Sequence, residues 1–133
     1  MKYKPYLLKD VYAGEAQNKF RVISTFAGGG GSSTGYRLAG GKILAINECV
    51  EEARNTYKDN YPNTPILDGD IKELQGKDFL DITKLKEGEL ELLDGSPPCS
   101  AFSMCGTLAR EGTVHSDGYG KTKSYSDGKI VTN

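Results

Sequence analysis

The sequence has 133 residues, of which 37% are hydrophobic and 26% charged, and this composition is typical of one globular domain. Its formal net charge is −1, so it lacks the basic excess that DNA-wrapping domains usually carry. It contains neither an apolar run long enough to cross a bilayer nor an amino-terminal signal peptide, and we therefore expect a cytoplasmic protein.

The cysteines and the histidine argue against a metal site. The three cysteines stand at positions 49, 99 and 105, and the single histidine is His115. These spacings fit no zinc knuckle, and an odd number of cysteines in a reducing compartment does not predict a disulfide framework. We therefore expect neither a metal ion nor a disulfide.

Regular secondary structure is expected to begin at Phe20. The preceding residues, 1–19, carry apolar side chains without a clean period, and we interpret them as an irregular lead-in or a short helix. Residues 20–26 are rich in β-favouring side chains and contain no breaker, which is typical of a central strand.

A glycine-rich loop follows this strand. Residues 28–31 are four consecutive glycines, and Ser33 or Thr34 is a suitable N-cap for the helix after them. That helix is expected to end at Gly40-Gly41. The succession of strand, glycine loop and helix is the first half of a mononucleotide-binding unit. The glycine spacing departs from G-x-G-x-x-G at Ser33, so a flexible turn without a ligand is the alternative.

The alternation of strands and helices continues along the chain. A second strand is predicted over residues 42–46, a helix over 50–61, a third strand over 66–67, a broken helix over 71–85 and a fourth strand over 90–93. Tyr57 and Tyr61 share the apolar face of the helix over 50–61, and Asp94-Gly95 is expected to break the fourth strand. Short links between alternating elements predict an α/β fold with a mostly parallel sheet, flanking helices and right-handed crossovers. After Gly106 the chain is poor in apolar residues, which predicts a mobile loop without a core of its own.

Acidic side chains stand at the ends of two further predicted strands. Glu48 lies 20 residues after Gly28, where nucleotide-binding folds place an acid that binds ribose hydroxyls, and Asp70 follows the third strand. Because the carboxyl ends of parallel strands meet at one edge, these groups together predict a site for an adenosine-bearing cofactor. Taken singly, Glu48 could instead stabilise a helix start, and Asp70 could serve an Asp-Gly-Asp turn.

Cys99 follows the fourth predicted strand on a stiff segment. Pro97 and Pro98 restrict the backbone and exclude both helix and sheet pairing. A cysteine held at the carboxyl end of a parallel strand stands where open α/β sheets carry out their chemistry. The alternative is a small buried residue, the common fate of a free cysteine, although the neighbours of Cys99 are loop residues.

Four segments of the sequence together resemble the DNA (cytosine-5)-methyltransferase family. They are Phe26-Ala27-Gly28-Gly29-Gly30-Gly31, Asn47-Glu48, Gly69-Asp70-Ile71 and Pro97-Pro98-Cys99-Ser100-Ala101-Phe102-Ser103. Their order and spacing match the family over about residues 20–106, and the Pro-Cys segment is the most specific. Methylases that modify exocyclic amines carry Asp/Asn-Pro-Pro-Tyr/Phe at that place. The resemblance implies a Rossmann-like, S-adenosylmethionine-dependent methyltransferase fold.

The resemblance also implies a role for individual residues. Cys99 would be the nucleophile that adds to carbon 6 of a flipped cytosine, so that carbon 5 can accept the methyl group. Ser100 and Ser103 would contact DNA, in a loop of residues 100–123 that closes over the base. The residues that would bind S-adenosylmethionine are Phe26, Ala27, Gly28, Gly30, Gly31, Glu48, Cys49, Asp70 and Ile71.

The chain departs from the family pattern at several positions. Ser24 stands where many members have an acid, Cys49 where an aromatic side chain often faces adenine, and Ser100 where glutamine is usual. The family's Glu-Asn-Val motif, which protonates the base ring, and its DNA-recognition domain do not occur in the sequence.

From these departures we expect the amino-terminal part of a DNA cytosine methyltransferase, nearly inactive by itself. It would comprise the lead-in 1–19, a partial cofactor-binding domain 20–106 and a catalytic-loop region 107–133. The partner of the complete enzyme would be DNA, and an open edge of a truncated sheet predicts association with a complementing C-terminal half or with a second copy. The alternative is a non-catalytic, cofactor-binding remnant.

Overall fold

The computed structural model describes residues 4–98 together with 114–116, 122–126 and 129–132. The chain divides into two compact units, Met1–Ser96 and Pro97–Asn133. No helix in these described ranges is long and apolar enough to span a membrane.

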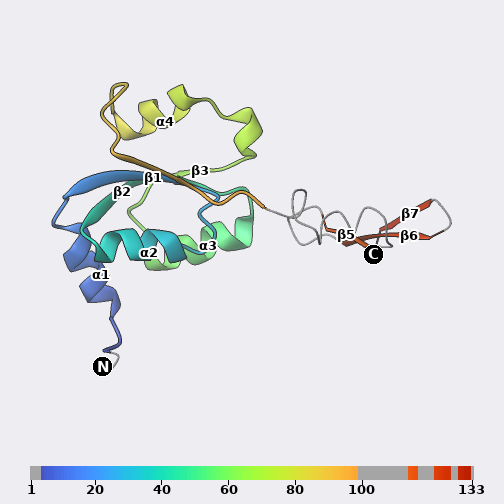
Figure 1. Ribbon diagram of the computed structural model, residues 1–133, viewed down its shortest axis with the longest axis horizontal. Helices are drawn as coiled ribbons and strands as arrows, with labels where there is room; N and C mark the ends of the chain where they lie inside the picture. The colour runs from blue at the N-terminus through green and yellow to red at the C-terminus, as the bar shows by residue number, and fades with distance from the viewer. Residues whose placement is uncertain (1–3, 99–113, 117–121, 127–128, 133) are drawn as a thin grey trace. The chain divides into compact units, whose positions relative to one another are not determined.

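A parallel sheet of four strands forms the centre of the first unit (Figure 1). The spatial order of its strands is β3-β2-β1-β4. The strands are β1 (Phe20–Thr25), β2 (Gly41–Asn47), β3 (Ile66–Leu67) and β4 (Leu92–Gly95). The two inner strands, β1 and β2, coincide with the β-favouring runs of the sequence. Nearly all of their residues are buried or partly buried, which explains why polar and apolar side chains do not alternate along them. The predicted Rossmann-like α/β class is confirmed.

The fourth strand ends later than predicted. Asp94 and Gly95 were expected to break it, but Gly95 is still paired with Thr25 of β1. The Thr25 hydroxyl also donates to the Asp94 carbonyl oxygen at 2.9 Å. The prediction of a break at Asp94 is therefore wrong, because pairing with β1 extends the strand into turn-favouring residues.

Helices cover both faces of the sheet (Figure 1). On one face lie α1 (Leu8–Glu15), α2 (Gly31–Leu38) and α3 (Glu51–Asn60); on the other lie the 3₁₀ helix η1 (Ile71–Glu73) and α4 (Gly76–Thr83). The broken helix predicted over 71–85 is confirmed as η1 and α4. For residues 1–19 the sequence left a lead-in or a short helix open, and the structure forms the helix.

The N-cap predicted for α2 is wrong. The helix begins at Gly31 with Gly30 as its N-cap, and Gly30 has a left-handed φ of +97°. Thr34 lies inside the first turn, where its hydroxyl donates to the Gly30 carbonyl oxygen at 2.8 Å. The glycines thus start the helix earlier than the hydroxyl residues alone indicate, because a positive φ suits glycine and turns the chain directly into it.

The core of the first unit lies between the sheet and the layer of α1, α2 and α3. Its buried members are Val11, Val22, Ile43, Ile46, Tyr57 and Tyr61. The side chains of Tyr57 and Tyr61, which the sequence placed on one helical face, are 0% and 4% exposed. Each large side chain buried in this way stabilises the fold by about 1.5–3 kcal/mol.

The second unit contains three backbone strands within its described residues. They are β5 (Val114–Ser116), β6 (Thr122–Ser126) and β7 (Lys129–Thr132), which pair antiparallel in the order β5-β6-β7. The sequence predicted a mobile loop without a core of its own after Gly106, and that stays a prediction; the structure adds these three short strands.

Candidate functional site

The glycine loop connects the end of β1 to the start of α2 in an unusual conformation. Phe26, Gly28 and Gly30 have φ values of +53°, +57° and +97°. The turn is closed by a hydrogen bond of 3.1 Å from the Gly30 amide to the Ala27 carbonyl oxygen. A left-handed non-glycine residue such as Phe26 costs of order 1–3 kcal/mol and persists only where the surroundings hold it.

Space remains beside this loop. A Cβ atom built on Gly28 or Gly31 would meet no other atom within 4 Å. The missing side chains therefore leave room for a ligand to approach the backbone amides, as the sequence predicted for a cofactor loop.

Glu48 joins the end of β2 to this loop. One carboxylate oxygen, Oε2, accepts a hydrogen bond of 2.8 Å from the Gly28 amide, and Oε1 accepts one of 2.9 Å from the Val50 amide at the start of α3. The residue is only 8% exposed. Glu48 therefore binds both the start of α3 and the glycine loop. Each of its carboxylate oxygens can still accept a further hydrogen bond from a hydroxyl group.

The end of β3 is tied to the same edge of the sheet. The Asn47 side-chain amide donates to the Leu67 and Gly69 carbonyl oxygens at 2.9 and 3.1 Å. Asp70 Oδ1 accepts from the Lys72 amide at 3.0 Å and so caps η1, which is the turn-type role left open by the sequence. The side chain of Cys49, beside Glu48, is partly buried.

Sequence reasoning missed Asp94 as a site residue. Its Oδ2 accepts from the Ser24 hydroxyl of β1 at 2.9 Å, and its Oδ1 accepts from the Tyr36 hydroxyl of α2 at 3.2 Å. Burial raises the pKa of Tyr36, and the negative charge of Asp94 raises it further. The available signal was Ser24, noted above as a departure from the family pattern, because its hydroxyl is the group that binds Asp94 of the neighbouring strand.

Asp94 stands just before the segment that leads to the predicted nucleophile. Pro97 and Pro98 are the last residues described before Cys99. Cys99, Ser100 and Ser103 lie outside the described residues, so their predicted roles stay predictions.

A cavity of about 740 Å³ lies on the α4 face of the sheet. Its wall is mainly apolar and includes Ile23 of β1, Phe79 of α4 and Leu93 of β4. Of the predicted cofactor residues only Ile71 contributes to it, so this cavity adjoins the strand-end site but does not coincide with it. In the part of the chain that the structure describes, no three His, Cys, Asp or Glu residues gather as metal ligands.

Comparison with protein families shows which family this chain belongs to. A family model of the C-5 cytosine-specific DNA methylases matches residues 20–120. The chain belongs to this family. The matched range contains every residue that the sequence predicted for the cofactor and for catalysis.

Curated relatives of this chain include three type II methyltransferases. M.AquIA of Picosynechococcus sp. is 35% identical over 86 residues, which cover 65% of this chain and 35% of the relative. M.NgoPII of Neisseria gonorrhoeae is 35% identical over 91 residues, covering 68% and 25%. M.DdeI of Desulfomicrobium norvegicum is 37% identical over 86 residues, covering 64% and 20%. The chain thus spans about a third or less of the length of these relatives.

Proposed function

We propose that this chain binds S-adenosylmethionine and takes part in methyl transfer to carbon 5 of cytosine in DNA, with Cys99 as the nucleophile. The observation that carries the proposal is the hydrogen bond between the Gly28 amide and Glu48 Oε2. It brings the glycine loop and Glu48 together at the carboxyl edge of the sheet, which supports a shared role in binding the cofactor. Membership of the cytosine methylase family supports the choice of cofactor and base.

The described residues fit this cofactor. Glu48 is buried and already oriented by two amides, and its remaining lone pairs are suited to the two ribose hydroxyls. The open space at Gly28 and Gly31 admits the amino-acid part of the cofactor to the loop amides. Asp70 and Ile71, at the end of β3, would bind the adenine.

The chemistry divides between cofactor and chain. When bound, S-adenosylmethionine would supply a methyl group from its sulfonium, whose carbon–sulfur bond breaks with the electron pair kept on sulfur, so that S-adenosylhomocysteine is the product. The Cys99 thiolate adds to carbon 6 of the cytosine, and the electron pair displaced from the 5,6 double bond makes carbon 5 a nucleophile for that methyl group. Loss of the carbon 5 proton to a base then restores the double bond and expels the thiolate. Base flipping is needed to bring the cytosine to the thiol.

Calorimetry of the full chain with S-adenosylhomocysteine tests the cofactor site. We expect binding by the wild type and a loss of about tenfold or more in affinity for Glu48→Gln, because the variant loses charged hydrogen bonds to the ribose. Glu52→Gln is the matched control, since Glu52 is exposed in the first turn of α3. It should bind as the wild type does. A folded wild-type chain that gives no heat at high ligand concentration would contradict the proposal.

A further inference from the structure

The glycine loop is supported from the α3 side by two tyrosine rings. A Cβ atom built on Gly30 would lie 3.0 Å from Cδ2 and Cε2 of Tyr57 and 3.2 Å from Cε2 of Tyr61. The two rings are packed against each other, with centroids 5.2 Å apart. Gly30 therefore rests directly on the buried rings, with no room for a side chain between them.

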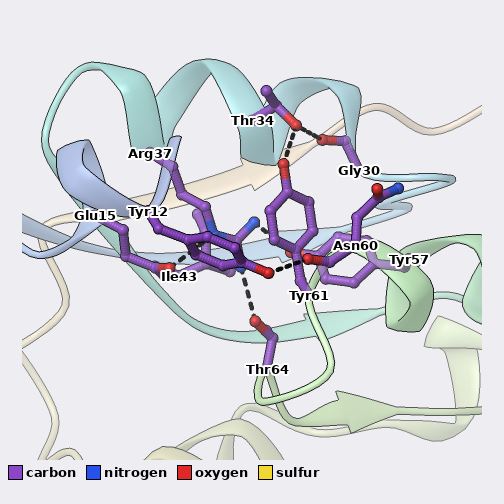
Figure 2. Close-up of polar contacts among 10 residues, drawn as sticks. All are labelled: Tyr12, Glu15, Gly30, Thr34, Arg37, Ile43, Tyr57, Asn60, Tyr61 and Thr64. Carbon is purple, nitrogen blue, oxygen red and sulfur yellow. Dashed lines mark hydrogen bonds and ion pairs between the residues drawn. The ribbon is translucent and has the colours of Figure 1, made fainter. Parts of the chain in front are cut away.

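A chain of hydroxyl groups reaches the same glycine. The Thr34 hydroxyl donates to the Gly30 carbonyl oxygen at 2.8 Å, and it is also hydrogen-bonded to the Tyr61 hydroxyl (Figure 2). Thr34 has one hydroxyl proton, and that proton is directed to Gly30. The Tyr61 hydroxyl is therefore the donor to Thr34, and it orients the Thr34 hydroxyl towards the loop.

Arg37 holds the two rings in place. Its guanidinium carbon lies 3.7 Å from the centroid of the Tyr61 ring, and its Nη1 donates to the Tyr57 hydroxyl at 3.1 Å (Figure 2). It also donates to Thr64 Oγ1 at 2.7 Å and pairs with Glu15 Oε2 at 3.1 Å. Because Arg37 is 0% exposed, any shift of the rings would disturb a buried, paired charge, which is costly.

The loop is thus held at two points by side chains from other parts of the chain. Glu48 of β2 accepts from the Gly28 amide, and the Tyr61–Thr34 pair binds the Gly30 carbonyl oxygen. These two attachments are only two residues apart, on a turn that also holds the non-glycine residue Phe26 at a φ of +53°.

We infer that Tyr61 is a positioning residue for the cofactor loop: through Thr34 it sets the Gly30 carbonyl, and thereby the adjacent loop amides, in the orientation that binds S-adenosylmethionine. The inference rests on the proposed cofactor site. The Tyr61 hydroxyl does not contact the ligand itself. Instead, this hydroxyl keeps the loop ordered before the ligand arrives, so that less conformational entropy is lost on binding.

Tyr61→Phe in the full chain tests the inference, with affinity for S-adenosylhomocysteine and unfolding temperature as the two measurements. We expect affinity to fall about three- to tenfold, the effect of one hydrogen bond. Tyr12→Phe is the matched control. It also removes one hydroxyl, which donates to the Asn60 carbonyl oxygen, and its ring stays against Tyr61. The control should leave affinity unchanged, and because Tyr12 is 41% exposed it should lower the unfolding temperature by no more than Tyr61→Phe does.

Variants of Thr34 test the route. Thr34→Val removes the hydroxyl and should weaken binding as Tyr61→Phe does, whereas Thr34→Ser keeps the hydroxyl and should bind as the wild type does. If Tyr61 acts through Thr34, the double variant Tyr61→Phe/Thr34→Val binds no more weakly than Thr34→Val alone. Additive losses would overturn the inferred route.

The outcomes separate this inference from the proposed function. If the folded wild type does not bind S-adenosylhomocysteine, the proposed cofactor site fails. If the wild type binds and Tyr61→Phe binds equally well, only the positioning role fails. Equal losses of affinity in Tyr61→Phe and Tyr12→Phe would likewise overturn it, because they would reflect general loosening of the α3 layer.

Discussion

At the scale of single residues, two carboxylates join elements that are far apart in the sequence. Glu48 binds amides of the glycine loop and of the start of α3, and Asp94 binds hydroxyls of Ser24 and Tyr36. Hydrogen bonds to a charged group contribute about 1.5–3 kcal/mol each. These side chains therefore stabilise the site and also decide where its parts lie.

Gly30 gives the sharpest prediction at this scale. Gly30→Ala should lower the free energy of unfolding by about 1–3 kcal/mol, because alanine is strained at a φ of +97° and its methyl group would press on the Tyr57 ring. Urea denaturation measures the change. Gly35→Ala in the middle of α2 is the control: its Cβ meets nothing within 4 Å, so it should be neutral or stabilising by up to about 1 kcal/mol. Equal effects of both changes would contradict the role given to Gly30.

At the scale of elements, β4 is a short edge strand attached to β1 by an ion pair beside its hydrogen-bond ladder. Glu91 accepts from the Arg21 backbone amide at 2.8 Å and from its guanidinium at 2.6 Å. The Arg21 side chain, followed by its backbone amide, lowers the pKa of Glu91 from 4.5 to about 2. The pair is exposed to solvent and therefore sensitive to salt.

The depressed pKa predicts a pH dependence. A carboxyl group with a lower pKa in the folded state stabilises the fold above its usual value of 4.5, and this contribution is lost as the pH falls towards about 2. Glu91→Gln should therefore have a lower urea midpoint at about pH 6 and lose less stability than the wild type on acidification to about pH 3. Glu73→Gln, at an exposed position of η1, should keep the wild-type pH dependence. An unchanged acid loss in Glu91→Gln would refute the assignment.

At the scale of the whole molecule, the first unit contains the whole parallel sheet and the buried cluster described above. The proposed ligand groups of the cofactor site also belong to it. The proposed nucleophile, Cys99, belongs to the second unit. Cofactor binding and covalent chemistry are thus assigned to different units of the chain.

A truncation tests this division. Residues 1–96 should unfold within about 3 °C of the full chain and bind S-adenosylhomocysteine equally well, because the sheet and its buried core are retained. Any methyl transfer to DNA should be absent, since Cys99 is removed. Residues 1–88 are the control; they lack β4, so β1 loses one of its two partners and the fold should be lost. Failure of residues 1–96 to fold would show that the two units are not independent.

Much of this arrangement could be read from local patterns. The β-favouring runs, the glycine loop and the apolar face that contains Tyr57 and Tyr61 predicted the inner strands, the turn and α3. The predictions for the end of β4 and for the N-cap of α2 were wrong for the same reason. In both, contacts outside the segment overrode local preference: pairing with β1 extended β4, and the buried tyrosines hold Gly30 at the start of α2.

The sequence by itself determined the α/β class, the family and the residue types at each strand end, because these depend on periodicity and on motif spacing. The sequence also predicted that Glu48 and the glycine loop meet at one sheet edge, but only the tertiary structure decided which atoms form hydrogen bonds. Glu48 with Gly28, Asp94 with Ser24, and Tyr61 with Thr34 are pairs 20, 70 and 27 residues apart. Arg37 is the clearest case: charged residues are usually exposed, and here packing of α1, α2 and α3 buries it among tyrosines. Such contacts depend on strand order and helix packing, which no local pattern encodes.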